Sequence, residues 1–200
     1  AVKECNGKIP VIAGTGSNST DEAIELSKFA EKAGSDALLV VTPYYNKPTQ
    51  EGLYQHYKKI NDSVGIPIII YNIPSRSVID MSVDTMAKLY ELKNIKGVKD
   101  ATGDLNRVDQ QLKAMGKEFI QLTGNDDNAF EFNKRGGVGA IGVTANVAAK
   151  LSSDFQNACV QNISKASEID KLLQPLHSSL FIESNPSPVK YAASLLGMCK

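Results

Sequence analysis

The chain has 200 residues, of which 42% are hydrophobic and 22% charged, and its 22 basic residues balance its 22 acidic ones. Without a long run of either charge, nucleic acid and anionic membrane surfaces are poor candidate partners, and the longest apolar run, near Ile66–Ile70, is too short to span a bilayer. Cys5, Cys159 and Cys199 are widely spaced, which argues against a disulfide framework or a structural zinc site. With no signal-like segment, we expect a cytoplasmic protein that acts on a small molecule.

Short apolar runs alternate along the chain with segments of helical periodicity. Continuous apolar runs of this kind are typical of strands in a parallel sheet with both faces covered. The six predicted strands are Ile9–Gly16, Ala37–Pro43, Ile66–Pro74, Ile95–Ala101, Phe119–Gly124 and Gly139–Asn146.

Capping residues mark where the intervening helices begin. Ser19 and Glu22 form a capping box for the first long helix, and the following helices are expected to begin near Thr49, Ser82 and Asp104. After the last predicted strand the chain is mostly helical, and this helical part is longer than the helix of a single βα unit.

Two architectures fit this alternation, a doubly wound open sheet and a (β/α)8 barrel. A barrel needs eight strands, and this sequence opens at Ala1 in what reads as the tail of a helix. We therefore expect a TIM (β/α)8 barrel without its first two βα units over residues 1–163, followed by the start of a C-terminal helical region over residues 164–200.

Lys99 stands in the middle of an otherwise buried strand. Strand side chains alternate between faces, so Ile95, Gly97, Lys99 and Ala101 share one face. Burial disfavours a charged amine, and a neutral amine condenses with a carbonyl to give a Schiff base. The small residues Gly97 and Ala101 are expected to leave room for a substrate. The alternative is a structural lysine whose head reaches solvent.

Other polar residues follow the predicted strands at the edge where ligands bind in both architectures. Tyr71 is expected to share a cavity with Lys99, where its phenol passes protons to and from a carbinolamine. Arg76 is placed to bind a carboxylate with two hydrogen bonds. Gly124 and Gly142 are expected to let backbone approach a ligand closely.

Several weaker signals favour structural roles. Gly14-Thr-Gly16 lacks the third glycine of a dinucleotide loop and reads as a turn. His56 and His177 lie on helical stretches away from the strand ends, and the sequence shows no cluster of metal ligands. Tyr44 and Tyr45 form a loop tip that faces either a site or a neighbouring subunit, with core aromatics as the alternative.

Five motifs together are distinctive: VTPYYNKPTQEGLYQHY, YNIPSRS, GVKDATGDLNRV, LTGNDD and GVTANVA. They resemble the dihydrodipicolinate synthase (4-hydroxy-tetrahydrodipicolinate synthase) family of class I pyruvate aldolases, which are related to N-acetylneuraminate lyase. The resemblance runs from about Ile9 to Leu196. It implies a TIM barrel lyase that condenses pyruvate with L-aspartate-4-semialdehyde in diaminopimelate and lysine biosynthesis, with no cofactor beyond the covalent pyruvate imine.

The resemblance also implies residue roles. Lys99 matches the Schiff-base lysine, Tyr71 the tyrosine that relays protons, and Arg76 the arginine that receives the semialdehyde carboxylate. Tyr45 matches a tyrosine contributed across a dimer interface, which implies a homotetramer built as a dimer of dimers. Further matches are pocket residues near pyruvate, Gly124 and Ile141, and residues that bind lysine as an allosteric feedback inhibitor, Asn18, Glu22 and Tyr44.

One motif of the family is absent, and there are two alternatives to the synthase. The family's second strand carries a G-T-T-G-E motif whose threonines contact the pyruvate carboxylate, and this sequence does not contain it. The alternatives are a sister aldolase that acts on a sugar acid, and a non-catalytic remnant of the barrel.

Overall fold

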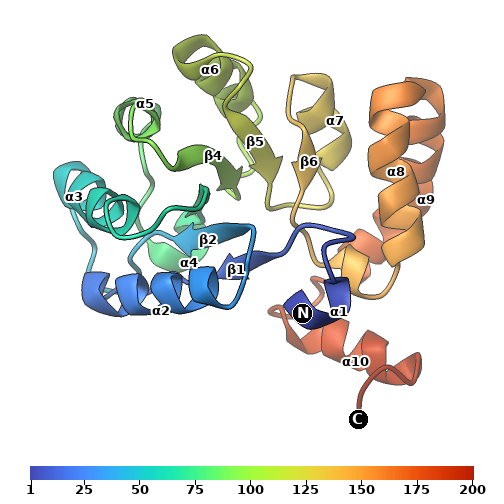
Figure 1. Cartoon of the computed structure of the whole chain (residues 1–200). Coiled ribbons are helices and arrows are strands. Elements are labelled where there is room, and N and C mark those ends of the chain that lie inside the picture. Colours follow the sequence, from blue (N-terminus) through green and yellow to red (C-terminus); the bar gives the residue numbers. More distant parts are fainter. The chain divides into compact units, whose positions relative to one another are not determined.

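Figure 1 shows the computed structural model, which describes all residues from 1 to 200. The chain divides into two compact units, Ala1–Leu122 and Thr123–Lys200. The first unit contains, in chain order, α1 (Val2–Cys5), β1 (Ile12–Gly14), α2 (Thr20–Lys32), β2 (Ala37–Val41), α3 (Gln50–Asn61), β3 (Ile68–Asn72), α4 (Pro74–Ser77), α5 (Val83–Tyr90), β4 (Ile95–Asp100), α6 (Asn106–Met115) and most of β5 (Ile120–Thr123).

The strands follow one another in the sheet in chain order, from β1 to β6. The pairs β1–β2, β2–β3 and β3–β4 are parallel, and Val41, Tyr71 and Lys99 lie in register on neighbouring strands. A doubly wound sheet reverses its strand order at a switch point, whereas a barrel does not. The unbroken order therefore confirms the prediction of a TIM-barrel arrangement and excludes the doubly wound sheet.

Alternate strand residues divide the first unit into two faces. Leu38, Val40, Ile68 and Ile70 are fully buried and belong to one hydrophobic core. Helices α2, α3, α5 and α6 pack side by side as the layer that covers this face (Figure 1). Residues that alternate with these along the strands, such as Tyr71 after Ile70, point to the opposite face, as strand alternation requires.

The predicted helix starts agree with the structure in three places of four. The hydroxyls of Ser19, Thr49 and Ser82 accept backbone N–H bonds from residues three positions later, the expected N-cap geometry. Helix α6 begins later than predicted, with Leu105 at its N-cap. The predicted cap Asp104 still accepts a bond of 3.0 Å from the backbone N–H of Asn106.

The second unit contains the end of β5 and a set of helices around its own core. Its elements are α7 (Ala129–Lys134), β6 (Gly139–Ala140), a 3-10 helix η1 (Thr144–Asn146), α8 (Ala149–Gln161), α9 (Ile163–Ser179) and α10 (Ser187–Leu195). Buried residues of α7, α8 and α9, among them Ala129, Phe155 and Leu173, form a core cluster. The domain boundary after residue 163 stays a prediction.

Strand β6 is much shorter than the predicted strand Gly139–Asn146. The Asp126 carboxylate accepts the backbone N–H groups of Val143 and Thr144, at 2.6 and 2.9 Å, so these groups turn away from strand pairing and enter η1. None of the helices is both long enough and apolar enough to cross a membrane.

Candidate active site

Lys99 and Tyr71 come together at the carboxyl ends of β4 and β3. They are register partners in the parallel pair, so both side chains emerge on the same face of the sheet. Lys99 is 9% exposed, and its Nζ lies 4.0 Å from the centroid of the Tyr71 ring. The two side chains therefore share one face and lie close together, whereas their sharing of one cavity stays a prediction.

Arg76 and Tyr71 interact through charge. Burial raises the pKa of the Tyr71 phenol, and the positive charge of Arg76 partly opposes that rise. Arg76 lies on the short helix α4, which directly follows β3. Since Pro74 occupies the first turn of this helix, where its missing N–H costs no bond, the chain can turn sharply beyond the strand end and bring Arg76 back toward Tyr71.

A pocket of about 580 Å³ in the first unit is lined by Tyr71 and Arg76, and Lys99 is not among its lining residues. It is mostly apolar, with a few polar groups, the composition usual for small-molecule sites. Its lining comes from the ends of β1, β2 and β3 and from the loops that follow β2 and β3: Gly14, Gly16, Leu39, Val41, Tyr44, Tyr45, Tyr71, Ile73, Arg76, Ser77 and Val78.

Tyr44 and Tyr45 lie in the loop after β2 and do not belong to the core. Tyr45 is 87% exposed and has a φ of 73°, and Tyr44 is 42% exposed. A left-handed backbone at an aromatic residue is uncommon and is found most often at functional sites. The structure thus places both tyrosines at the mouth of the pocket and excludes the alternative of core aromatics.

The loop before α2 carries Asn18, and the first turn of α2 carries Glu22. The amide of Asn46, two residues beyond Tyr44, donates a bond of 3.1 Å to the carbonyl of Asn18. The Ser17 hydroxyl donates to the Glu22 carboxylate. Of the three residues predicted to bind lysine, Asn18 and Tyr44 therefore lie on two loops that are joined by a hydrogen bond, and Glu22 lies in the first turn of α2.

The prediction that Gly97 leaves room for a substrate is wrong. A Cβ at this position would lie 2.2 Å from the carbonyl oxygen of Ile120 and 2.6 Å from its Cβ. The absence of a side chain therefore lets β5 pack closely against β4. Glycine at a close backbone approach is a structural alternative to glycine at a ligand site, and the sequence does not separate the two.

In the second unit, the predicted pocket residues Gly124 and Ile141 lie next to each other. The Ile141 N–H donates a bond of 2.9 Å to the carbonyl of Thr123, the residue before Gly124. At Gly142 a Cβ would lie 1.7 Å from a carboxylate oxygen of Asp126, and close approach of a ligand to this backbone stays a prediction. That space is filled by the protein's own side chain.

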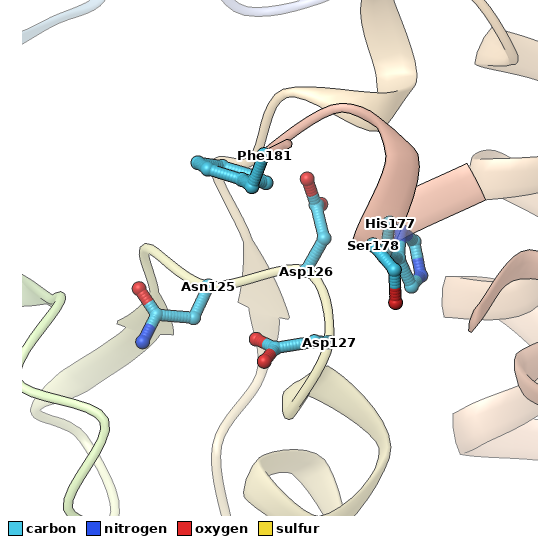
Figure 2. Close-up of a pocket in the computed structure, with 6 residues that line it drawn as sticks. All are labelled: Asn125, Asp126, Asp127, His177, Ser178 and Phe181. Atoms are coloured by element: carbon cyan, nitrogen blue, oxygen red, sulfur yellow. The ribbon is translucent and has the colours of Figure 1, made fainter. Parts of the chain in front are cut away.

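A second hollow, of about 290 Å³, lies in the second unit and is shown in Figure 2. Asp126 and Asp127 project from one loop, and His177 and Ser178 come from α9. His177 is buried, and its Nδ1 lies 2.7 Å from the Thr144 hydroxyl. The sequence interpretation had separated His177 from the strand ends, but α9 places it against Thr144 in η1, four residues beyond the end of β6. No group of three or more His, Cys, Asp or Glu side chains is arranged to hold a metal ion.

The sequence interpretation missed a set of buried polar residues behind Lys99 and Tyr71. Asn72 is fully buried, Asp100 is 5% exposed and Arg107 is 9% exposed. The Arg107 Nε donates to the Asp100 carboxylate at 2.9 Å. The only signal in the sequence was that Asn72 and Asp100 each directly follow a candidate catalytic residue.

Comparison with known proteins places the chain in a family. The sequence model of the Dihydrodipicolinate synthetase family matches residues 1–200. The 4-hydroxy-tetrahydrodipicolinate synthase of Pelagibacter ubique is 75% identical over 202 residues, covering 99% of this chain and 69% of that protein.

Solved structures agree with this match. Dihydrodipicolinate synthase from Acinetobacter baumannii, complexed with pyruvate, has a TM-score of 0.97 and 46% identity, covering 100% of this chain and 69% of that one. The enzyme from Cyanidioschyzon merolae, with lysine bound, has a TM-score of 0.90 and 36% identity, covering 94% and 65%. The chain belongs to the dihydrodipicolinate synthase family.

Proposed function

We propose that this protein is a 4-hydroxy-tetrahydrodipicolinate synthase, a lyase that condenses pyruvate with L-aspartate-4-semialdehyde in lysine biosynthesis. The observation that carries the proposal is the position of the Lys99 Nζ, 4.0 Å from the centre of the Tyr71 ring, in a largely buried site. The names of the relatives and the pyruvate complex of the Acinetobacter baumannii enzyme support it.

The first half of the proposed reaction uses Lys99 and Tyr71. The lysine nitrogen adds to the C2 carbonyl of pyruvate, and the carbinolamine that forms loses water to give an imine. Tyr71 passes the protons that these two steps need, with Tyr45 as the next member of the relay. Because burial raises the pKa of the Tyr71 phenol, the phenol holds its proton until a stronger base receives it. The imine makes a separate cofactor unnecessary.

The second half uses Arg76. Loss of a proton from C3 of the imine gives an enamine, which attacks the aldehyde carbon of the semialdehyde and forms a carbon–carbon bond. The Arg76 guanidinium holds the semialdehyde carboxylate, for which its planar set of donors is well shaped. Gly124 and Ile141 are proposed to contact pyruvate.

Borohydride trapping tests the Schiff base directly. Incubation with pyruvate and borohydride should add the mass of pyruvate less one oxygen atom, and peptide mapping should place it on Lys99. The measurement is made on this chain and on the full open reading frame that encodes it. An adduct in the longer protein alone would mean that residues outside this chain complete the site.

Two lysines on one strand provide a matched control for that experiment. Lys99→Met should abolish the adduct, whereas Lys96→Met should not, because Lys96 is exposed and points to the other face of β4. Absence of an adduct in the folded full-length protein would refute the proposal and favour a non-catalytic remnant.

Arg76 separates the synthase from the sister aldolase that acts on a sugar acid. Arg76→Ala should raise the KM for the semialdehyde by about tenfold to a hundredfold, the effect of losing one charge-assisted contact of about 1.5–3 kcal/mol, and should still permit pyruvate trapping. Condensation kinetics that do not change would contradict the assignment. Arg135→Ala, on the C-cap of α7, controls for the loss of a positive charge.

We further propose lysine as an allosteric inhibitor that binds at Asn18, Glu22 and Tyr44. The hydrogen bond between the two loops supports this site, as does the lysine complex of the Cyanidioschyzon merolae enzyme. Glu22→Gln should remove inhibition by lysine, because the carboxylate that pairs with a ligand amine is lost. Glu25→Gln, at an exposed position of the same helix, should leave the inhibition intact.

The exposed Tyr45 supports a proposed homotetramer, a dimer of dimers in which the tyrosine reaches into the neighbouring subunit's site. If so, mixing an inactive Lys99→Met variant with an inactive Tyr45→Phe variant should restore activity, since one mixed site then holds both native residues. Mixtures that stay inactive would contradict this role. A cytoplasmic location stays a prediction.

A further inference from the structure

The face of the sheet opposite the proposed active site carries a connected set of polar groups. Asn72 follows Tyr71 on β3, Asp100 follows Lys99 on β4, and the two are register partners. Since strand side chains alternate, Asn72 and Asp100 point to the helix-covered face while Tyr71 and Lys99 point to the opposite face. The contacts that hold Asn72 and Asp100 in place therefore also fix the backbone that carries Tyr71 and Lys99.

Asn72 closes the base of the loop that carries Arg76. Its Nδ2 donates a bond of 2.7 Å to Asp80 Oδ1, and its Oδ1 accepts a bond of 3.0 Å from the Met81 N–H. The chain between these two contacts turns through α4 and includes Arg76. The loop thus begins and ends on one fully buried amide.

Each oxygen of the Asp100 carboxylate accepts two hydrogen bonds. One carboxylate oxygen accepts the Arg107 Nε at 2.9 Å and the Gln111 Nε2 at 3.0 Å. The other accepts the backbone N–H of Thr102 at 2.9 Å and its hydroxyl at 2.6 Å. Four hydrogen bonds, one of them to a guanidinium, fix this buried carboxylate in a single orientation.

Arg107 joins the two ends of this arrangement. Besides Asp100, it donates from Nη1 to Asp80 at 3.1 Å and from Nη2 to the carbonyl of Met81 at 2.7 Å. One guanidinium on α6 therefore connects the end of β4 to the end of the Arg76 loop. We call Asn72, Asp80, Asp100 and Arg107 the clasp.

We propose that the clasp is a positioning device that sets the Arg76 loop on the strand ends carrying Tyr71 and Lys99. The inference rests on the proposed function, because it assigns Arg76 to the second substrate. None of the four clasp residues lines the pocket, so the clasp acts through Arg76 and does not contact substrate. If the clasp positions Arg76, its loss should weaken semialdehyde binding. If the clasp serves only stability, its loss should lower the Tm and leave semialdehyde binding unchanged.

The test exchanges the two partners at the base of the loop. Asn72→Asp alone sets two carboxylates against each other, and we expect it to raise the KM for the semialdehyde about tenfold, since displacing a binding group by about 1 Å can cost a hundredfold in rate. Adding Asp80→Asn restores one amide facing one carboxylate and should recover most of the affinity. Asn72→Ser removes the contact without adding charge and serves if Asn72→Asp does not fold.

Asn94→Ala is the matched structural control. Asn94 is buried at the opposite end of β4 and donates to the carbonyls of Asn61 and Val64, so its loss should lower the Tm without changing the KM for the semialdehyde. All variants are made in the full open reading frame, with KM, kcat, Tm and borohydride trapping measured for each.

The outcomes separate the two proposals. A full-length protein that neither traps pyruvate nor forms product would overturn the proposed function and this inference with it. An active protein in which Asn72→Asp or Asn72→Ser lowers the Tm but leaves the KM unchanged would overturn the positioning role alone. A raised KM that the exchange of both partners does not reverse would overturn the assignment to the Asn72–Asp80 contact.

Discussion

His56 should make folding stability depend on pH below neutrality. Its ring is buried on α3, its Nδ1 lies 2.9 Å from the Thr20 hydroxyl, and its Nε2 has no hydrogen-bond partner. Burial lowers the pKa of His56 from 6.5 to about 4. Below pH 6.5 the unfolded chain therefore binds a proton at this position that the folded chain does not bind. The stability that depends on a neutral His56 is therefore fully present above pH 6.5 and decreases as the pH drops toward 4.

The size of the effect follows from the difference between the two pKa values. A shift from 6.5 to about 4 is 2.5 units, and at about 1.4 kcal/mol per unit the folded state should lose about 3 kcal/mol between pH 7 and pH 4. This is a large fraction of the 5–15 kcal/mol typical of a domain.

Urea unfolding of wild type and His56→Asn at pH 7, 5.5 and 4 measures this contribution. Carboxylates titrate in both proteins, so their effect cancels in the difference between the two free energies of unfolding. As the pH falls from 7 to 4, the free energy of unfolding of wild type should decrease by about 3 kcal/mol more than that of the variant. Two curves that stay parallel over this range would show that the His56 ring is solvated or paired, and the reasoning from burial would be refuted.

Three further substitutions test packing and buried hydrogen bonds. Gly97→Ala should lower stability by about 1–3 kcal/mol in thermal unfolding, because the new Cβ would overlap Ile120; an unchanged Tm would contradict the close strand contact. Tyr57→Phe removes a buried hydroxyl that donates to the carbonyl of Val40 at 2.7 Å, and a loss of about 1–3 kcal/mol should appear in urea unfolding, with no loss expected if water replaces the hydroxyl. Thr144→Val leaves the buried His177 Nδ1 without its partner and should increase hydrogen exchange at the end of α9; unchanged protection there would count against that hydrogen bond.

The elements that the sequence predicted well are those with a local cause. Ser19, Thr49 and Ser82 cap their helices through side-chain bonds that span three residues. The pairing of Lys99 with Tyr71 was also predictable, because alternation along two parallel strands of known direction places both side chains on one face.

What the sequence did not predict depends on contacts between distant segments. The buried residues of α6 are Arg107, Val108 and Gln111, and only Val108 is apolar. A hydrophobicity pattern treats arginine and glutamine as outward residues. Only the position of the Asp100 carboxylate, fixed by the sheet, explains why this helix face is polar.

The prediction that Gly97 leaves room for a substrate failed for a related reason. A glycine in a strand indicates that something approaches closely, but the sequence does not say whether that is a ligand, a backbone or a side chain. At Gly97 the neighbour is strand β5, and at Gly142 it is the Asp126 carboxylate. At both positions the close neighbour is therefore another part of the protein.

Strand alternation gives a general reason why the clasp lies where it does. A strand that presents a reactive side chain to the pocket presents the next residue to the helix layer, where a small change in backbone position is resisted by close packing. An apolar residue at Asn72 or Asp100 would pack there, but it would not fix the orientation of the strand end as a hydrogen-bonded side chain does. Because Arg107 donates to both Asp80 and Asp100, one buried guanidinium controls the loop that carries Arg76 and the strand that carries Lys99 together.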